Sequence, residues 1–171
     1  MDFLRIGILV ATLLVATYTD LAHRKIYNWN TYPAIGLGIG LAAGEALSEN
    51  SWVWLWPSLF GFGLCALIFA LPFLLSWLGD GDYKLLLGIG ALQGAPMNPA
   101  FMPNAIYNIA LIGAIMAFLL LIWRGQLLAG LRGSLRLITQ PKIQAIHEHE
   151  QMPYGVAIAM GTLWTLWGVL R

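Results

Sequence analysis

Charged side chains are scarce in this chain of 171 residues, in which Asp, Glu, Lys and Arg make up 10% and hydrophobic residues 59%. An ordinary soluble domain has about 25% charged residues, and the mean hydropathy here is +0.73. This excludes a soluble globular domain and predicts an integral membrane protein in a lipid bilayer. The cations are few, give a net charge of +1 and form no basic face, so we expect no nucleic-acid binding.

Cysteine is almost absent as well, since Cys65 is the single one. A lone cysteine excludes an intrachain disulfide and a zinc site made of clustered cysteines. No small-x-small cleavage pattern follows the first apolar run, so we expect its helix to be retained. Because there is no soluble linker or internal repeat, residues 1–171 are predicted to form a single transmembrane domain.

Long apolar runs, by contrast, fill most of the chain. A bilayer core of about 30 Å needs about 20 residues per helix, and six apolar segments are candidate spans: 3–19, 32–47, 52–78, 85–95, 104–123 and 152–170. The fourth is short, so its helix is expected to begin near Asp82 or to continue past residue 95. Residues 127–138 repeat leucine at helical spacing beside two arginines. We predict an all-α membrane protein, a six-transmembrane-helix bundle with this interfacial amphipathic helix between helices 5 and 6.

The second apolar segment carries a ridge of small residues, Gly36, Gly40 and Gly44. Small residues at every fourth position let another helix approach closely, so the ridge predicts either packing against a neighbouring helix or docking of a substrate helix. Glu45 and Glu49 are expected to mark the loop that follows this segment.

The cations predict the orientation. Alternating six spans puts seven of them on one side and only Arg5 and Arg171 on the other. The seven are Arg24, Lys25, Lys84, Arg124, Arg132, Arg136 and Lys142. By the positive-inside rule their side is cytoplasmic and both termini lie outside. Asp20, after the first span, and Asp82, before the fourth, are then expected at the same cytoplasmic level.

Carboxylates this close to hydrocarbon are costly to place, and chains that keep them usually use them. A pair of carboxylates can hydrolyse a peptide bond without a metal, because one takes a proton from water while the other polarises the carbonyl. We expect Asp82, near a helix N-terminus and Lys84, to be the more readily ionised, and Asp20, near a helix C-terminus, to be the acid. Gly79 and Gly81 would allow a tight turn and the approach of a substrate backbone.

Simpler interpretations of the same residues stay open. The segment Gly-Asp-Gly-Asp can be a polar turn, Asp20 a solvated helix end and Lys84 a topology anchor. Tyr154 and Gly155 either line the site or only anchor the last helix at the interface. A run of alternating histidines and glutamates offers at most a loose surface metal site, so no metal site is predicted: His147, Glu148, His149 and Glu150.

Three stretches resemble the prepilin peptidases, the GxGD membrane aspartic proteases. Residues 79–86, GDGDYKLL, match the GxGDxK signature of that family, and Asp20 followed by residues 24–28, RKIYN, resembles its other half. Tyr27 stands where the family usually has proline. Residues 153–159, PYGVAIA, are similar to the stretch that opens the family's last helix.

The resemblance implies a catalytic dyad of Asp20 and Asp82, with Gly79, Gly81 and Lys84 completing the motif, while Asp80 occupies its variable position. Possible site-lining residues are Asn28, Tyr154 and Gly155. The implied substrate is a prepilin or pseudopilin precursor cut between a short cytoplasmic leader and an apolar helix. No cofactor is implied, and the membrane is the bacterial-type inner (cytoplasmic) membrane.

The single cysteine makes the chain similar to the compact, peptidase-only type associated with Flp or tight-adherence pili, which has no N-methyltransferase cysteine cluster. The alternative function is a small proton- or ion-coupled transporter or channel subunit, because intramembrane acids also carry ions. A non-catalytic assembly subunit is a third possibility. The sequence does not predict an oligomeric state.

Overall fold

The computed structural model describes residues 2–93, 100–123 and 154–171, and in these ranges it contains helices and no strand. The elements are α1 (Asp2–His23), α2 (Asn28–Ser48), the 3₁₀ helix η1 (Trp52–Trp54), α3 (Trp56–Leu74), α4 (Asp80–Leu92), α5 (Phe101–Trp123) and α7 (Tyr154–Leu170). The all-α prediction is confirmed. The amphipathic helix expected at 127–138 and the histidine-glutamate run at 147–150 lie outside the described residues.

Three segments are long and apolar enough to cross a membrane, namely Phe3–His23, Trp52–Leu74 and Phe101–Leu119. Helix α7 is apolar but has 17 residues, and α4 has only 13. The chain is therefore a membrane protein with at least these three membrane-capable helices, and the number of six spans stays a prediction. Helix α4 begins at Asp80, slightly before the position expected from the sequence.

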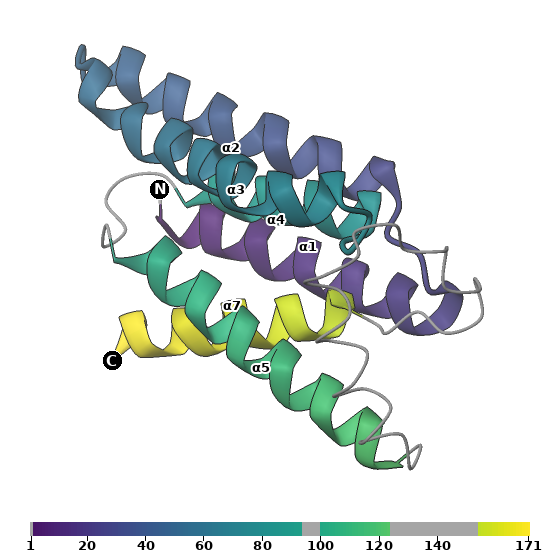
Figure 1. Ribbon diagram of the computed structural model, residues 1–171. Helices are drawn as coiled ribbons and strands as arrows, with labels where there is room; N and C mark the ends of the chain where they lie inside the picture. The colour runs from purple at the N-terminus through teal and green to yellow at the C-terminus, as the bar shows by residue number, and fades with distance from the viewer. Residues whose placement is uncertain (1, 94–99, 124–153) are drawn as a thin grey trace.

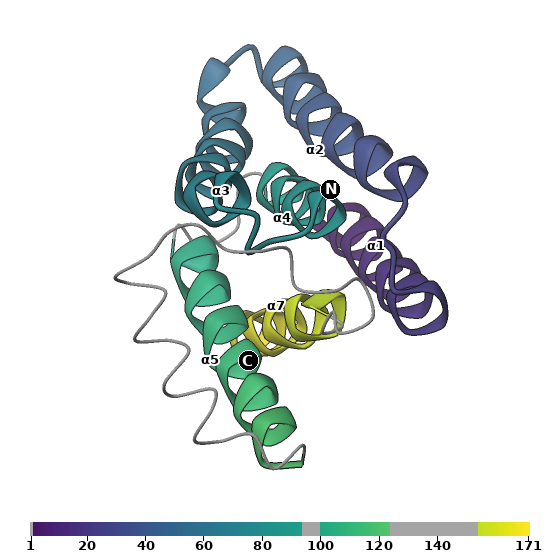
Figure 2. The same ribbon diagram turned by 45° about the vertical axis from the view of Figure 1, so that its right-hand side comes forward.

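Successive helices run in alternating directions, and both ends of the chain lie at the same end of the bundle (Figure 1). Helix α4 packs against α2 and α3, whereas α5 packs on α7, and α7 also contacts α1 (Figure 2). The bundle thus has two parts that meet along α4 and α1. The last turn of α1 and the first turns of α4 and α7 come together at the end opposite the termini (Figure 1).

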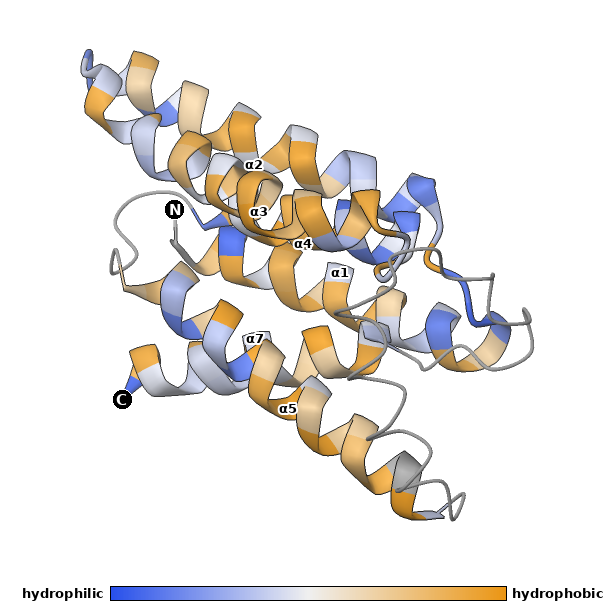
Figure 3. Ribbon diagram, in the orientation of Figure 1, coloured by the Kyte–Doolittle hydropathy of each residue, from blue (hydrophilic) through white to orange (hydrophobic). Residues whose placement is uncertain are grey.

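The hydropathy of the helices follows this arrangement (Figure 3). Apolar residues dominate the helix bodies, while hydrophilic segments gather toward the helix ends (Figure 3). Helix α4 is the most enclosed, because almost its whole second half is buried, from Leu85 to Leu92. A helix that is apolar all round belongs in a core, which explains why α4 lies inside although it is the shortest α-helix of the described residues.

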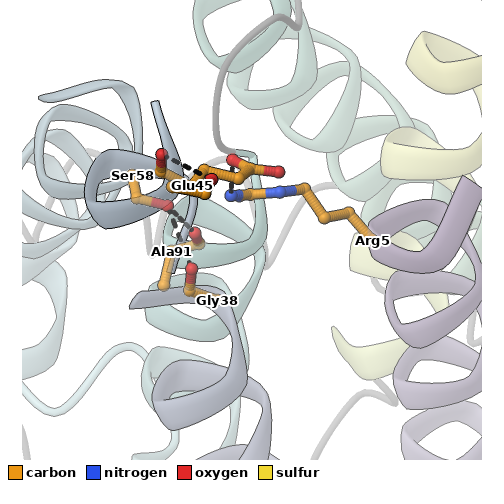
Figure 4. A network of polar contacts seen from close by, with 6 residues as sticks. Arg5, Gly38, Glu45, Ser58 and Ala91 are labelled. Carbon is orange, nitrogen blue, oxygen red and sulfur yellow. Dashed lines mark hydrogen bonds and ion pairs between the residues drawn. The ribbon is translucent and has the colours of Figure 1, made fainter. Parts of the chain in front are cut away.

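Glu45 lies inside α2 and not in a loop, so the sequence expectation for this residue is wrong. Its Oε2 accepts a hydrogen bond from Nη2 of Arg5 at 2.5 Å (Figure 4). The Arg5 side chain is 1% exposed and the Glu45 side chain 9%. The helix can continue past this acid because a cation from α1 compensates the buried charge.

The glycine ridge of α2 also differs from the expectation. A Cβ added at Gly36, Gly40 or Gly44 would meet no described atom within 4 Å. The close approach occurs instead at Gly38, where a Cβ would lie 2.5 Å from the carbonyl carbon of Ala91 in α4. The close packing expected at Gly36, Gly40 and Gly44 is therefore wrong, because α2 turns the face that carries Gly38 toward α4.

Ser58 of α3 completes this contact between α2 and α4. Its hydroxyl group lies 2.5 Å from the carbonyl oxygen of Ala91 and 3.3 Å from that of Gly38 (Figure 4). A hydroxyl carries one donor hydrogen, so the two carbonyls share it. One buried side chain thereby joins three helices beside the close approach of Gly38 to Ala91.

Substituting Gly38 by alanine tests this packing. Because the added methyl would meet backbone atoms, which cannot move aside, we expect Gly38→Ala to lower the free energy of unfolding by about 1–3 kcal/mol. The matched variant Gly40→Ala adds a methyl in open space and should be neutral or stabilising by up to about 1 kcal/mol. Unfolding in detergent measures both, and equal effects at the two positions would contradict the packing described here.

Candidate active site

Asp20 lies in the last turn of α1 and is 6% exposed. Its Oδ2 accepts a hydrogen bond of 2.8 Å from the backbone N–H of Gly155, and the N–H of Val156 also donates to this carboxylate. Both amides belong to the first turn of α7, where backbone N–H groups have no partner within the helix. The N-terminus of α7 therefore holds the carboxylate of Asp20.

Asp82 lies in the first turn of α4 and is partly buried. Gly79 is the N-cap residue of that helix, and its backbone N–H donates a hydrogen bond to the Asp82 carboxylate. A carboxylate three residues after the N-cap reaches back to the cap amide in the same way in a capping box. The spacing of glycine and aspartate in the motif is thus the spacing that closes the first turn of α4.

The structure brings the two carboxylates together. Asp20 is near enough for its charge to act on Asp82. Helix α4 contacts the connection between α1 and α2 at Gly81, where a Cβ would lie 2.8 Å from both Cβ and the carbonyl oxygen of Ile26. The space beside Gly81 is therefore taken by the connection between α1 and α2, and not by a ligand as the sequence suggested.

Lys84 is directed away from the acid pair. Its Nζ lies 2.6 Å from Oδ2 of Asp80, 3.1 Å from Oδ1 of Asn28 and 5.2 Å from the ring centre of Tyr32. The hydrogen bond that Lys84 donates to the Asp80 carboxylate raises the pKa of Lys84 above its usual value. Lys84 thus joins the start of α4 to the start of α2, and Asp80 is its exposed ion-pair partner.

Only part of the reasoning behind the expected division of charge holds, since Asp82 does lie in the first turn of α4 and Asp20 in the last turn of α1. Lys84 pairs with Asp80 and not with Asp82. Asp82 lies outside the three membrane-capable segments, and burial, with the charge of Asp20 adding to it, raises its pKa to about 7, against the opposing effect of the Gly79 N–H. Asp20, for its part, faces the N-terminus of α7 as well as ending α1. Because the charge of Asp20 acts on Asp82, ionisation of one carboxyl group disfavours ionisation of the other.

Tyr27 occupies the position where the related motif has proline. It is the N-cap residue of α2, with φ −86° and ψ 142°, and its carbonyl accepts hydrogen bonds from the N–H groups of Asn30 and Thr31. These angles are close to polyproline geometry, which proline would also adopt. The turn therefore keeps its shape without proline, and the ring of His23 packs edge-on against Tyr27 at 6.1 Å.

Gly155 and Tyr154 differ in their placement. A Cβ at Gly155 would lie 2.7 Å from Oδ2 of Asp20, so only glycine lets the start of α7 approach the carboxylate this closely. Tyr154 is 40% exposed and lies beside it. Val156 and Ile26 were not among the residues expected at the site. For Val156 a signal was present, because a proline followed by a helix start indicates backbone amides that have no partner within the helix. Within the described ranges, no group of three metal-ligating side chains is present.

Comparisons with known proteins identify one peptidase family. The model of the type IV leader peptidase family matches residues 7–122, which is more than half of the chain and contains both aspartates. The chain belongs to the type IV leader peptidase family. It is 30% identical over 110 residues to prepilin peptidase EppA of Methanothermobacter thermautotrophicus. That alignment covers 64% of this chain but 28% of the relative, and no solved structure matches.

The resemblance to prepilin peptidases found in the sequence is thereby confirmed. The family match favours the peptidase interpretation over a transporter or channel subunit. The match ends before α7, so the contact between Gly155 and Asp20 is an observation from the structure alone.

The raised pKa predicts how stability depends on pH. Asp82 titrates near 3.8 when unfolded and at about 7 when folded, so its ionisation destabilises the fold increasingly between these values. Asparagine keeps the shape and the acceptor oxygen but has no charge. We expect Asp82→Asn to raise the Tm in detergent by several degrees at pH 8 and by little at pH 4.

Asp80→Asn is the matched control, because Asp80 is exposed and paired with Lys84. It should show no gain in Tm that grows with pH. Scanning fluorimetry of the wild-type protein and of the Asp82→Asn and Asp80→Asn variants from pH 4 to pH 8 measures the change in Tm. A gain for Asp82→Asn that is the same at every pH would mean that charge burial does not cause it.

Proposed function

We propose that this protein is a membrane aspartic endopeptidase that removes the leader from prepilin or pseudopilin precursors, with Asp20 and Asp82 as its catalytic pair. The observation that carries the proposal is the meeting of two carboxylates from distant helices, each held by a glycine amide, in a chain of the type IV leader peptidase family. Two carboxyl groups that lie close together can catalyse the hydrolysis of a peptide bond without a cofactor.

The reaction needs one ionised and one protonated carboxyl group. The ionised group takes a proton from water, and the resulting hydroxide adds to the carbonyl carbon of the peptide bond, while the protonated group donates a hydrogen bond to the carbonyl oxygen. In the second step the C–N bond breaks and the departing amine receives a proton from the pair. The mutual repulsion of Asp20 and Asp82 favours the singly protonated pair that this sequence requires.

The glycine amides support this chemistry by orientation. The hydrogen bonds from the backbone N–H groups of Gly155 and Val156 fix the orientation of the Asp20 carboxylate. The N–H of Gly79 likewise fixes Asp82 from one side. Fixed carboxylates lose little entropy when the substrate binds, and correct orientation is a large part of catalysis.

The finer assignments of substrate and side belong to the same proposal. We infer a Flp-type or related pilin precursor as substrate and the cytoplasmic membrane face as the site of cleavage, with both termini outside. The support is the family together with the cations that flank the acid pair, Arg24, Lys25 and Lys84, which favour the cytoplasmic side. No cofactor or metal is needed for the proposed reaction.

A cleavage assay tests the catalytic pair. Purified protein in detergent is mixed with a prepilin-type precursor, and release of the leader is followed by mass spectrometry. Because each acid transfers protons, Asp20→Asn and Asp82→Asn are each expected to lower kcat by about 10²–10⁴-fold. Asp80→Asn, in which only the exposed partner of Lys84 changes, should stay active. Full activity of either dyad variant would rule out the pair, and an inactive wild-type protein would reopen the transporter alternative.

Gly155→Ala tests the orientation of Asp20. The added methyl would lie within contact distance of the Asp20 carboxylate and push it from its hydrogen bond. A displacement of about 1 Å at a catalytic group can cost up to about 10²-fold, so kcat should fall within that range with little change in KM. Gly168→Ala is the matched control in α7, because a Cβ there meets no described atom. Equal losses at both positions would argue for a general effect on α7.

A further inference from the structure

An apolar groove lies between the two parts of the bundle, on the side formed by α3, α4, α5 and α7, with a volume of about 350 Å³. Its lining has no charged side chain. Phe69, Pro72 and Trp77 come from α3 and the turn after it, and Leu86 lies at its floor. Trp77 is 51% exposed, so the groove is open at this end.

The groove opens directly beside the acid pair. Leu78 lines it and precedes Gly79, whose N–H binds Asp82. Tyr154 lines it from the other side and precedes Gly155, whose N–H binds Asp20. Both catalytic carboxylates are therefore held by the residues that immediately follow the walls of the groove.

The wall formed by α5 consists of Ile109 and four small residues. The small residues occupy one helix face at spacings of three and four, and they are Ala110, Gly113, Ala114 and Ala117. A Cβ at Gly113 would contact only Ala157, at 3.9 Å, so the described chain leaves this face unfilled. A face of small residues lets another helix pack closely in a membrane.

We propose that this groove receives the apolar helix of the precursor and so presents the bond before that helix to Asp20 and Asp82. The uncharged lining fits an apolar helix, the small face of α5 gives it room, and the continuity of the walls with Gly79 and Gly155 directs its end to the acids. This inference rests on the proposed function. It places substrate docking on α5 and α7, and not on the glycine ridge of α2.

Photo-crosslinking tests the location. Benzoylphenylalanine is incorporated in place of Ala114 in the groove or, as a control, in place of Leu37 on the exposed face of α2. Both proteins carry Asp82→Asn so that bound precursor is not cut. We expect the precursor's apolar helix to crosslink through position 114 and not through position 37. Crosslinking through position 37 alone, through neither position, or between two copies of this chain through position 114 would overturn the inference.

A kinetic test uses matched glycine substitutions. Gly113→Leu fills the groove without meeting the backbone, and we expect it to raise the KM for the full precursor about tenfold, with kcat changed less than KM. Gly40→Leu adds the same side chain to the open ridge of α2 and should leave KM unchanged. A larger effect at Gly40 than at Gly113 would contradict the groove.

The two levels of the proposal fail in different ways. If the wild-type protein cleaves the precursor but neither crosslinking nor KM responds at the groove, then the docking site is wrong and the proposed function stands. If the wild-type protein does not cleave the precursor, then the proposed function fails, whatever crosslinks through position 114.

Discussion

Carboxylates inside an apolar bundle need hydrogen-bond donors that the bundle can supply, and helix N-termini are its nearest source. Asp20 uses the first turn of α7, and Asp82 uses the cap of its own helix α4. The rest of the structure depends on this requirement. Helix α7 must begin at the level where α1 ends, and α4 must begin beside the connection from α1 to α2, which Gly81 makes possible by its contact with Ile26.

Most of the helices and the two aspartates of the candidate site could be predicted from the sequence. The helices follow from long apolar runs, and the two aspartates stand out because charge is rare. The rotation of each helix about its axis could not be predicted. Small residues at every fourth position do not say which neighbour they face, so Gly38 and not Gly40 meets α4. For the same reason, the pairing of Lys84 with Asp80 was not foreseen, although the two lie four residues apart on one helix.

The division of the bundle relates the site to the groove. Helices α2, α3 and α4 form one packed group around Asp82, while α5 and α7 form another that holds Asp20 in place. Each group therefore supplies backbone amide donors to the acid pair and one wall to the groove. The geometry of the acid pair and the width of the groove both depend on the spacing of the two groups, so a change in that spacing would alter both.

Arg5 and Glu45 join α1 to α2 near the other end of the bundle (Figure 4). Losing one partner would leave a buried charge uncompensated, which typically costs about 3–5 kcal/mol, whereas replacing both by apolar residues is often neutral. Evolution can therefore change these two positions together far more easily than one at a time. In related chains we expect an arginine at the first position to accompany an acid at the second. The presence of both residues would then indicate that α1 and α2 pack in the same way as in this chain.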